Sequence, residues 1–148
     1  MGLGQEKLNK PLDNMGNFRE IHENPLSDGA IERMKDLLES CVNSHPQCCP
    51  PSDAHLPRRV IDIGDEGTNL RLYISEGEKQ QYAALSHCWG SSQLLTTDRA
   101  TISDRQKGIN SQDLPKTFRD AIKICHILGI RYIWIDSLCI IQDDRYDG

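Results

Sequence analysis

The feature that most limits the fold is a strand, helix, strand pattern in the second half of the chain. Residues 82–86 are a short apolar run, residues 115–128 carry apolar side chains at helical spacing, and residues 130–135 are β-branched and aromatic. Pro115 suits a first helical turn, and Gly129 suits the left-handed stop after the last turn. The connection is long enough for a parallel crossover. The pattern predicts an α/β fold with two parallel strands, the first buried on both faces.

The first half of the chain predicts a helix and a β-hairpin. Apolar side chains recur at helical spacing between Ile31 and Cys41. In residues 59–63 and 70–74, which flank a Gly-rich turn, apolar and polar side chains alternate with period two. Residues 46–53 are rich in proline and cysteine and interrupt the helix. We therefore divide the chain into a polar lead-in over 1–26, a helix with a linker over 27–58, and an α/β unit over 59–148.

Charge and composition exclude several classes of protein. The chain has 17 Lys and Arg against 22 Asp and Glu, a net charge of −5, which argues against nucleic acid as a partner. The longest apolar stretch, residues 130–141, is short and contains Arg131 and Asp136, so we expect no membrane span. The N-terminus has no apolar signal segment, and six cysteines without one indicate reduced thiols. We expect a cytoplasmic protein.

Polar side chains follow both strands of the predicted crossover. In open parallel sheets, ligands bind beyond the carboxyl ends of the strands, so these residues are expected to converge. We predict that chemistry is carried by Ser86, His87 and Asp136. The residues predicted to bind a ligand or cofactor are Trp89, Ser137, Cys139, Gln142 and Asp143. The alternative is that Ser86 and Asp136 only cap turns, while Trp89 and Cys139 fill the core.

Two further chemistries were weighed against this prediction. A cysteine nucleophile cannot pair His87 with Cys88, because successive side chains of a strand point to opposite faces. It needs His87 with Cys139, or Cys88 with His126. A zinc site needs four ligands, and Cys41, His45, Cys48 and Cys49 supply four donors of suitable softness. Their spacing fits no familiar zinc pattern and Cys48 adjoins Cys49, so we assign no metal site.

Three blocks of the sequence resemble the fungal heterokaryon-incompatibility (HET) domain. They are residues 82–90 (YAALSHCWG), residues 114–122 (LPKTFRDAI) and residues 129–143 (GIRYIWIDSLCIIQD). The resemblance extends over about residues 35–147. It implies a role in non-self recognition and regulated cell death, with homotypic or other HET-domain proteins as partners. It also implies a sheet similar to that of Toll/interleukin-receptor (TIR) domains, which is a flavodoxin-like parallel sheet flanked by helices.

The resemblance to TIR-type effectors implies NAD as a substrate that is cleaved at its bond to nicotinamide, and we assign no cofactor. In the HET pattern the block around Gln142 leads into a tryptophan and then a helix that bears a glutamate. Here Gly148 stands where that tryptophan is expected. We therefore expect an incomplete domain that lacks its catalytic glutamate and exposes an apolar face at Ile133 and Ile135. A non-catalytic module that binds other HET domains is the alternative function.

Overall fold

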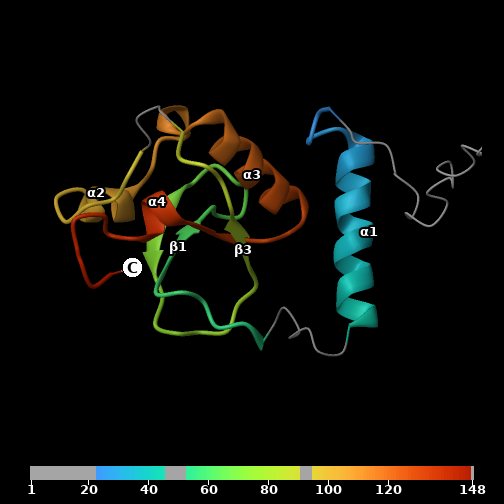
Figure 1. The fold of residues 1–148 in the computed structure, drawn as a ribbon, viewed down its shortest axis with the longest axis horizontal. Helices are drawn as coiled ribbons and strands as arrows, with labels where there is room; N and C mark the ends of the chain where they lie inside the picture. The colour runs from blue at the N-terminus through green and yellow to red at the C-terminus, as the bar shows by residue number, and fades with distance from the viewer. Residues whose placement is uncertain (1–22, 46–52, 91–94, 148) are drawn as a thin grey trace, which may run out of the picture.

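The computed structural model describes residues 23–45, 53–90 and 95–147. Along the chain, it forms the helix α1 (Asp28–Ser44), the strands β1 (Arg59–Asp62), β2 (Arg71–Ile74) and β3 (Tyr82–Leu85), the helix α2 (Ile102–Lys107), the 3-10 turn η2 (Ser111–Asp113), the helix α3 (Lys116–Ile127), the strand β4 (Tyr132–Ile135) and the short helix α4 (Asp136–Cys139) (Figure 1). The α/β class, the N-terminal helix and the strand hairpin are confirmed.

The four strands form one mixed sheet in the order β2-β1-β4-β3. β3 and β4 are parallel, as the crossover pattern predicts, and their register pairs Leu85 with Ile135. β1 and β2 are the predicted antiparallel hairpin. β4 also pairs antiparallel with β1, through Ile61 and Ile133, and this pairing joins the hairpin to the crossover. The parallel arrangement is thus confined to the β3 and β4 pair.

Helix α3 supplies one wall of the core. Its buried side chains Phe118, Ile122 and Cys125 are three or four residues apart, so they share one face of the helix. They join Ile61 and Ile133 of the sheet in a single hydrophobic cluster. Pro115 is the N-cap residue, and Gly129 after the helix has φ of 72°, a conformation that glycine adopts without strain. α3 therefore begins and ends within one residue of its predicted limits.

Two burial predictions for the sheet are wrong. β3 was expected to be buried on both faces, but it is an edge strand whose residues are half-buried or exposed. Ile133 and Ile135 were expected on an exposed apolar face, but they are 1% and 0% exposed. The cause is the same in both cases: β4 lies in the interior of the sheet between β1 and β3, and its apolar face is covered by the core cluster.

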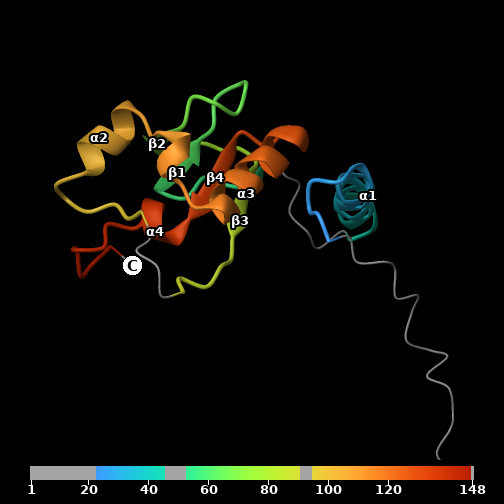
Figure 2. The ribbon, with the colours of Figure 1, turned by 90° about the horizontal axis from the view of Figure 1, so that it is seen from above.

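Helix α1 begins with a side-chain cap, since Ser27 Oγ accepts a hydrogen bond from the Ala30 amide at 3.3 Å. Ala30 and Ile31 are buried near its start, whereas Leu37, Leu38 and Val42 are exposed. The helix stands beside the sheet and α3 in both views (Figures 1 and 2). Within the described ranges, no helix is long and apolar enough to cross a membrane.

The C-terminal segment is attached to β1 by a buried ion pair. The Asp147 carboxylate accepts a hydrogen bond from Arg59 Nη2 and another from the Ile141 amide at 2.7 Å. Arg59 Nε donates to the Cys139 carbonyl at 2.7 Å. The side chains of Arg59 and Asp147 are only 6% and 7% exposed. This pair therefore holds residues 139–147 against the sheet.

Candidate functional site

The parallel pairing of β3 and β4 brings the ends of both strands to one edge of the sheet. Because Leu85 pairs with Ile135, the residues that follow them, Ser86 and Asp136, leave the sheet side by side. The structure thus places together His87 and Trp89 from the first strand end and Asp136 from the second, as the contacts below show. We call His87, Trp89 and Asp136 the strand-end cluster.

His87 is buried, and its imidazole has an edge-on contact with a core ring. Its side chain is 7% exposed, and its ring centroid lies 4.9 Å from that of Phe118 in a T-shaped arrangement. Neither ring nitrogen has a hydrogen-bond partner among the described residues. The nearest carboxylate oxygen in the cluster, Asp136 Oδ1, is 3.7 Å from Nδ1. Buried polar atoms are normally paired, so this ring is a candidate for contact with a ligand.

Asp136 has two roles at once. Its Oδ1 accepts a hydrogen bond from the Ser137 amide at 2.7 Å within the first turn of α4, whose N-cap residue is Ile135. Its Oδ2 accepts one from Trp89 Nε1, also at 2.7 Å, across 47 residues of sequence. Trp89 itself is 41% exposed, so the alternative that its ring fills the core is wrong. The carboxylate therefore fixes an exposed indole beside the buried imidazole.

Hydroxyl groups near the two strand ends differ in their surroundings. Ser86 is exposed, and no hydrogen bond joins its side chain to another described residue. Ser137 is completely buried, and its Oγ is also without a partner among the described residues. Thr97 Oγ1 is likewise buried and without a hydrogen-bond partner among the described residues. The backbone amide of Thr97 donates to the Ser137 carbonyl at 3.0 Å. Thr97 is not among the site residues predicted from the sequence, and it lies before α2, whose N-cap residue is Thr101.

The cysteines do not form the nucleophile pairs that were weighed. Cys139 is buried, its Sγ accepts a hydrogen bond from the Ile135 amide at 3.4 Å, and burial raises the pKa of its thiol to about 12. Such a thiol is protonated at neutral pH and is a poor nucleophile. Cys88 is exposed beyond β3, whereas His126 contacts the region of Gly67 near the other end of the sheet. The cysteine alternatives therefore receive no support from the geometry.

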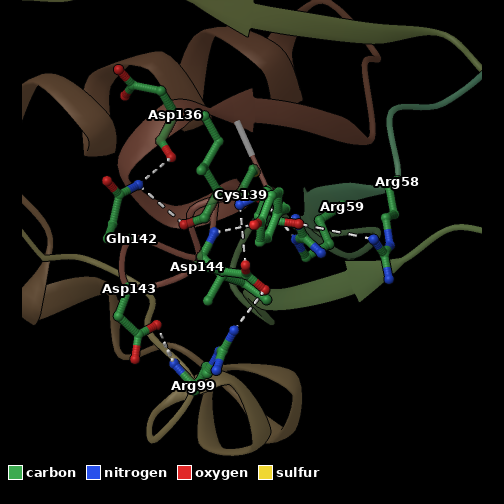
Figure 3. Close-up of polar contacts among 12 residues, drawn as sticks. Arg58, Arg59, Arg99, Asp136, Cys139, Gln142, Asp143 and Asp144 are labelled. Atoms are coloured by element: carbon green, nitrogen blue, oxygen red, sulfur yellow. Dashed lines mark hydrogen bonds and ion pairs between the residues drawn. The ribbon is translucent and has the colours of Figure 1, made fainter.

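The side chains of Gln142 and Asp143 hydrogen-bond to backbone groups. Gln142 Nε2 donates to the carbonyls of Asp136 and Ile140 at 3.2 and 3.1 Å, and Asp143 Oδ1 accepts from the Arg99 amide at 3.0 Å. Figure 3 shows the Asp136 carboxylate pointing away from both side chains. These two predicted ligand-binding residues lie apart from the carboxylate that contacts Trp89.

The four donors weighed for zinc are only partly within the described residues. Cys41 lies in the last turn of α1 and His45 follows its end, whereas Cys48 and Cys49 lie outside the described ranges. Over residues 23–45, 53–90 and 95–147, no three potential metal-ligating side chains come together.

Comparison with known proteins identifies the part of the chain that contains this cluster. Residues 82–147 match the model of a family described as "Heterokaryon incompatibility protein (HET)". The match begins at β3, ends at Asp147 and includes all three residues of the strand-end cluster. Neither the curated proteins nor the solved structures gave a match to the chain. Residues 82–147 are thus similar to the heterokaryon incompatibility (HET) family, in agreement with the three sequence blocks that resemble it.

Proposed function

We propose that this protein acts in fungal non-self recognition, as a HET-domain component of the response that ends in regulated cell death. The family match over residues 82–147 supports this role. The biological proposal predicts that expression of the full chain in a compatible fungal host alters cell viability after hyphal fusion. Viability that is the same with and without the chain, at equal expression, would contradict it.

At the molecular level we propose that the strand-end cluster binds a small ligand. The observation that carries the proposal is the His87 ring, which is buried while both of its nitrogens lack partners among the described residues. An unpaired buried polar group costs about 1 to 3 kcal/mol. A ligand that hydrogen-bonds to this ring would recover that free energy. The exposed Trp89 indole beside it offers an apolar face on which a planar heterocycle can stack.

NAD is the ligand that we propose, by way of the TIR-like resemblance. Its nicotinamide and adenine rings are planar heterocycles with polar edges, which suits an indole, an imidazole and a carboxylate. Cleavage of its glycosidic bond passes through an oxocarbenium-like state that a nearby carboxylate stabilises. Both oxygens of Asp136 already accept hydrogen bonds, and no described glutamate contacts the cluster. We therefore propose that the cluster binds NAD, without assigning the cleavage step to its residues.

Calorimetric titration of the full chain with NAD tests the proposed site. We expect saturable binding that Asp136→Asn weakens about tenfold, because the substitution removes the charge that holds Trp89 Nε1. Asp113→Asn is the matched control, since Asp113 is exposed on η2 and outside the cluster. No binding by the folded wild-type chain, or equal weakening by both variants, would contradict the proposal. Release of nicotinamide by this chain would show that it also cleaves NAD.

The second candidate function is a non-catalytic module that binds other HET-domain proteins. The observation that favours it is the exposed apolar surface of α1 at Leu37, Leu38 and Val42. Exposed apolar patches mark interaction surfaces when they are contiguous. Co-purification with a full-length HET-domain protein is expected for the wild type and should be lost in Leu38→Ser with Val42→Ser. Retention of the complex by the double variant would exclude this surface.

We also propose that the chain divides near residues 26 and 58 and that the protein lies in the cytoplasm. Limited proteolysis is expected to cut first within residues 1–58 and to leave a resistant fragment that begins near Arg59. A fluorescent fusion of the full chain is expected to distribute through the cytoplasm. A protease-resistant fragment that begins at β3 would place the boundary later in the chain.

A further inference from the structure

A polar cleft opens at the end of the sheet opposite to the strand-end cluster. Its volume is about 610 Å³, and it lies where β1 ends and where β2 and β4 begin. Arg131 lines this cleft just before β4, and Asp136 follows the other end of the strand. Five residues of strand span roughly 16 Å, so the cleft is a separate feature from the cluster.

A buried carboxylate organises the cleft. Asp62, which is 2% exposed, accepts hydrogen bonds from Arg71 Nε and Nη2 at 3.2 and 3.0 Å. It also accepts from Arg131 Nε and Nη2 at 2.9 and 3.2 Å, and from the Gly64 amide at 3.0 Å. These paired bonds fix the orientation of two guanidinium groups against one hidden anion. A ligand would therefore meet cations that are already ordered, which lowers the entropic cost of binding.

The groups that face solvent in the cleft are mainly hydrogen-bond donors. The side chains of Arg71 and Arg131 are 51% and 46% exposed, although each is anchored on Asp62. Lys107, at the end of α2, adds a third cation that is 77% exposed. Its ion pair with Asp104, at 3.0 Å, is fully on the surface and therefore weak. Asn69 and Asn110 line the same cleft and carry amide donors.

The two carboxylates that line the cleft are both paired with arginine. Asp62 lies beneath the two guanidinium groups, and Asp65, whose side chain is 90% exposed, pairs with Arg131 Nη1 at 3.0 Å. The hydrogen bonds of Arg71 to Asp62 use Nε and Nη2, and Nη1 has no partner among the described residues. We therefore expect Nη1 and Lys107 Nζ to be available to an anion. Guanidinium and ammonium groups that line one cleft are suited to bind the oxygens of a phosphate group.

We propose that this cleft binds the phosphate group of a small phosphate ester. The phosphate would lie between Arg71 and Lys107, and the rest of the ligand would occupy the remaining volume along Asn69 and Asn110. A cleft of about 610 Å³ falls in the usual range for small-molecule sites and is larger than inorganic phosphate requires. The polar lining favours a hydrophilic ligand such as a sugar phosphate. This proposal is independent of the function proposed for the strand-end cluster.

The test is a titration of the ¹⁵N-labelled full chain, followed by NMR, at constant ionic strength. The probes are inorganic phosphate, ribose 5-phosphate and succinate. We expect saturable shifts of the Gly64 and Gly108 amides with both phosphates, with the ester bound more tightly and succinate not bound. Equal binding of both phosphates would overturn the assignment of an ester. Equal binding of succinate would overturn the assignment of phosphate.

Two substitutions connect the binding to the proposed residues. Lys107→Gln removes one exposed cation and is expected to weaken ribose 5-phosphate binding about tenfold, whereas Lys35→Gln, on α1, should leave it unchanged. Arg71→Lys keeps the charge but loses the two-pronged contact with Asp62, and it is expected to weaken binding while the chain stays folded. Unchanged affinity in both cleft variants, or shifts that chloride reproduces, would overturn the proposal.

Discussion

Replacement of His87 by leucine separates a functional role for the ring from a structural one. The substitution keeps a buried side chain of similar size but removes two ring nitrogens that have no partner among the described residues. Relief of an unpaired buried polar group contributes about 1 to 3 kcal/mol. Loss of the T-shaped contact with Phe118, at 4.9 Å, costs about 0.5 to 1.5 kcal/mol. We expect the free energy of unfolding to change by about −0.5 to +2.5 kcal/mol, which is the difference between these two contributions.

The assay is urea unfolding of the full chain followed by circular dichroism, with the NAD titration repeated on the same samples. NAD affinity should fall about tenfold or more in His87→Leu, because the ligand loses its hydrogen bond to the imidazole. His126→Leu is the matched control, since His126 is exposed on α3 and its replacement should change stability by less than about 0.5 kcal/mol.

Two outcomes would refute the reasoning about His87. A loss of more than about 2 kcal/mol, with an unchanged dependence on urea, would show that the imidazole stabilises the fold more than its unpaired nitrogens weaken it. Unchanged NAD affinity in a stable His87→Leu variant would show that the ring does not contact this ligand. The first outcome concerns the energetics of burial, and the second concerns the site.

Three further predictions follow from buried charged and thiol groups. Burial alone would raise the pKa of Asp62, but hydrogen bonds from Arg131, Gly64 and Arg71 outweigh it and lower the pKa below its ordinary value. The stability that the Asp62 carboxylate contributes is therefore present above about pH 4 and is lost as pH falls through the lowered pKa. We expect Asp62→Asn to have a lower free energy of unfolding than the wild type at pH 6, and this difference should disappear at pH 2. An equal disadvantage at both pH values would count against this ionisation. Asp147→Ala leaves the Arg59 guanidinium buried without its carboxylate partner, and chemical unfolding should show a loss of about 3 to 5 kcal/mol. A loss below about 1 kcal/mol would mean that water replaces the carboxylate. Finally, a thiol reagent at neutral pH should label the exposed Cys88 about tenfold faster than Cys139, whose pKa is about 12, as peptide mapping would reveal. Equal rates would indicate that the C-terminal segment opens readily.

The elements of the crossover were predictable because their signals are local. Phe118, Ile122 and Cys125 repeat with the helical period, and Gly129 marks the end of α3, so the helix was expected within one residue of its observed limits. The antiparallel hairpin was predicted because apolar and polar side chains alternate on both sides of a Gly-rich turn. In both cases the pattern that forms the element lies within the element itself.

The position of each strand in the sheet was not predictable from such patterns. The apolar composition of β3 suggested burial on both faces, but its place at the edge leaves it partly exposed. The antiparallel pairing of Ile61 with Ile133 connects residues 72 positions apart, and it is what buries β4. Pairings over such separations depend on how all the elements pack together, and no local spacing encodes them.

For the candidate site, the sequence by itself determined which side chains leave the ends of β3 and β4, since parallel neighbours must end at the same edge. Only the tertiary structure decided what each one does. Packing on Phe118 buries the His87 ring without partners, and Asp136 reaches Trp89 through space. The same folding encloses Cys139 and turns Gln142 toward backbone carbonyls. The long helical connection between β3 and β4 indicates that the two strands are parallel, whereas burial and side-chain partners arise from contacts between segments that are distant in sequence.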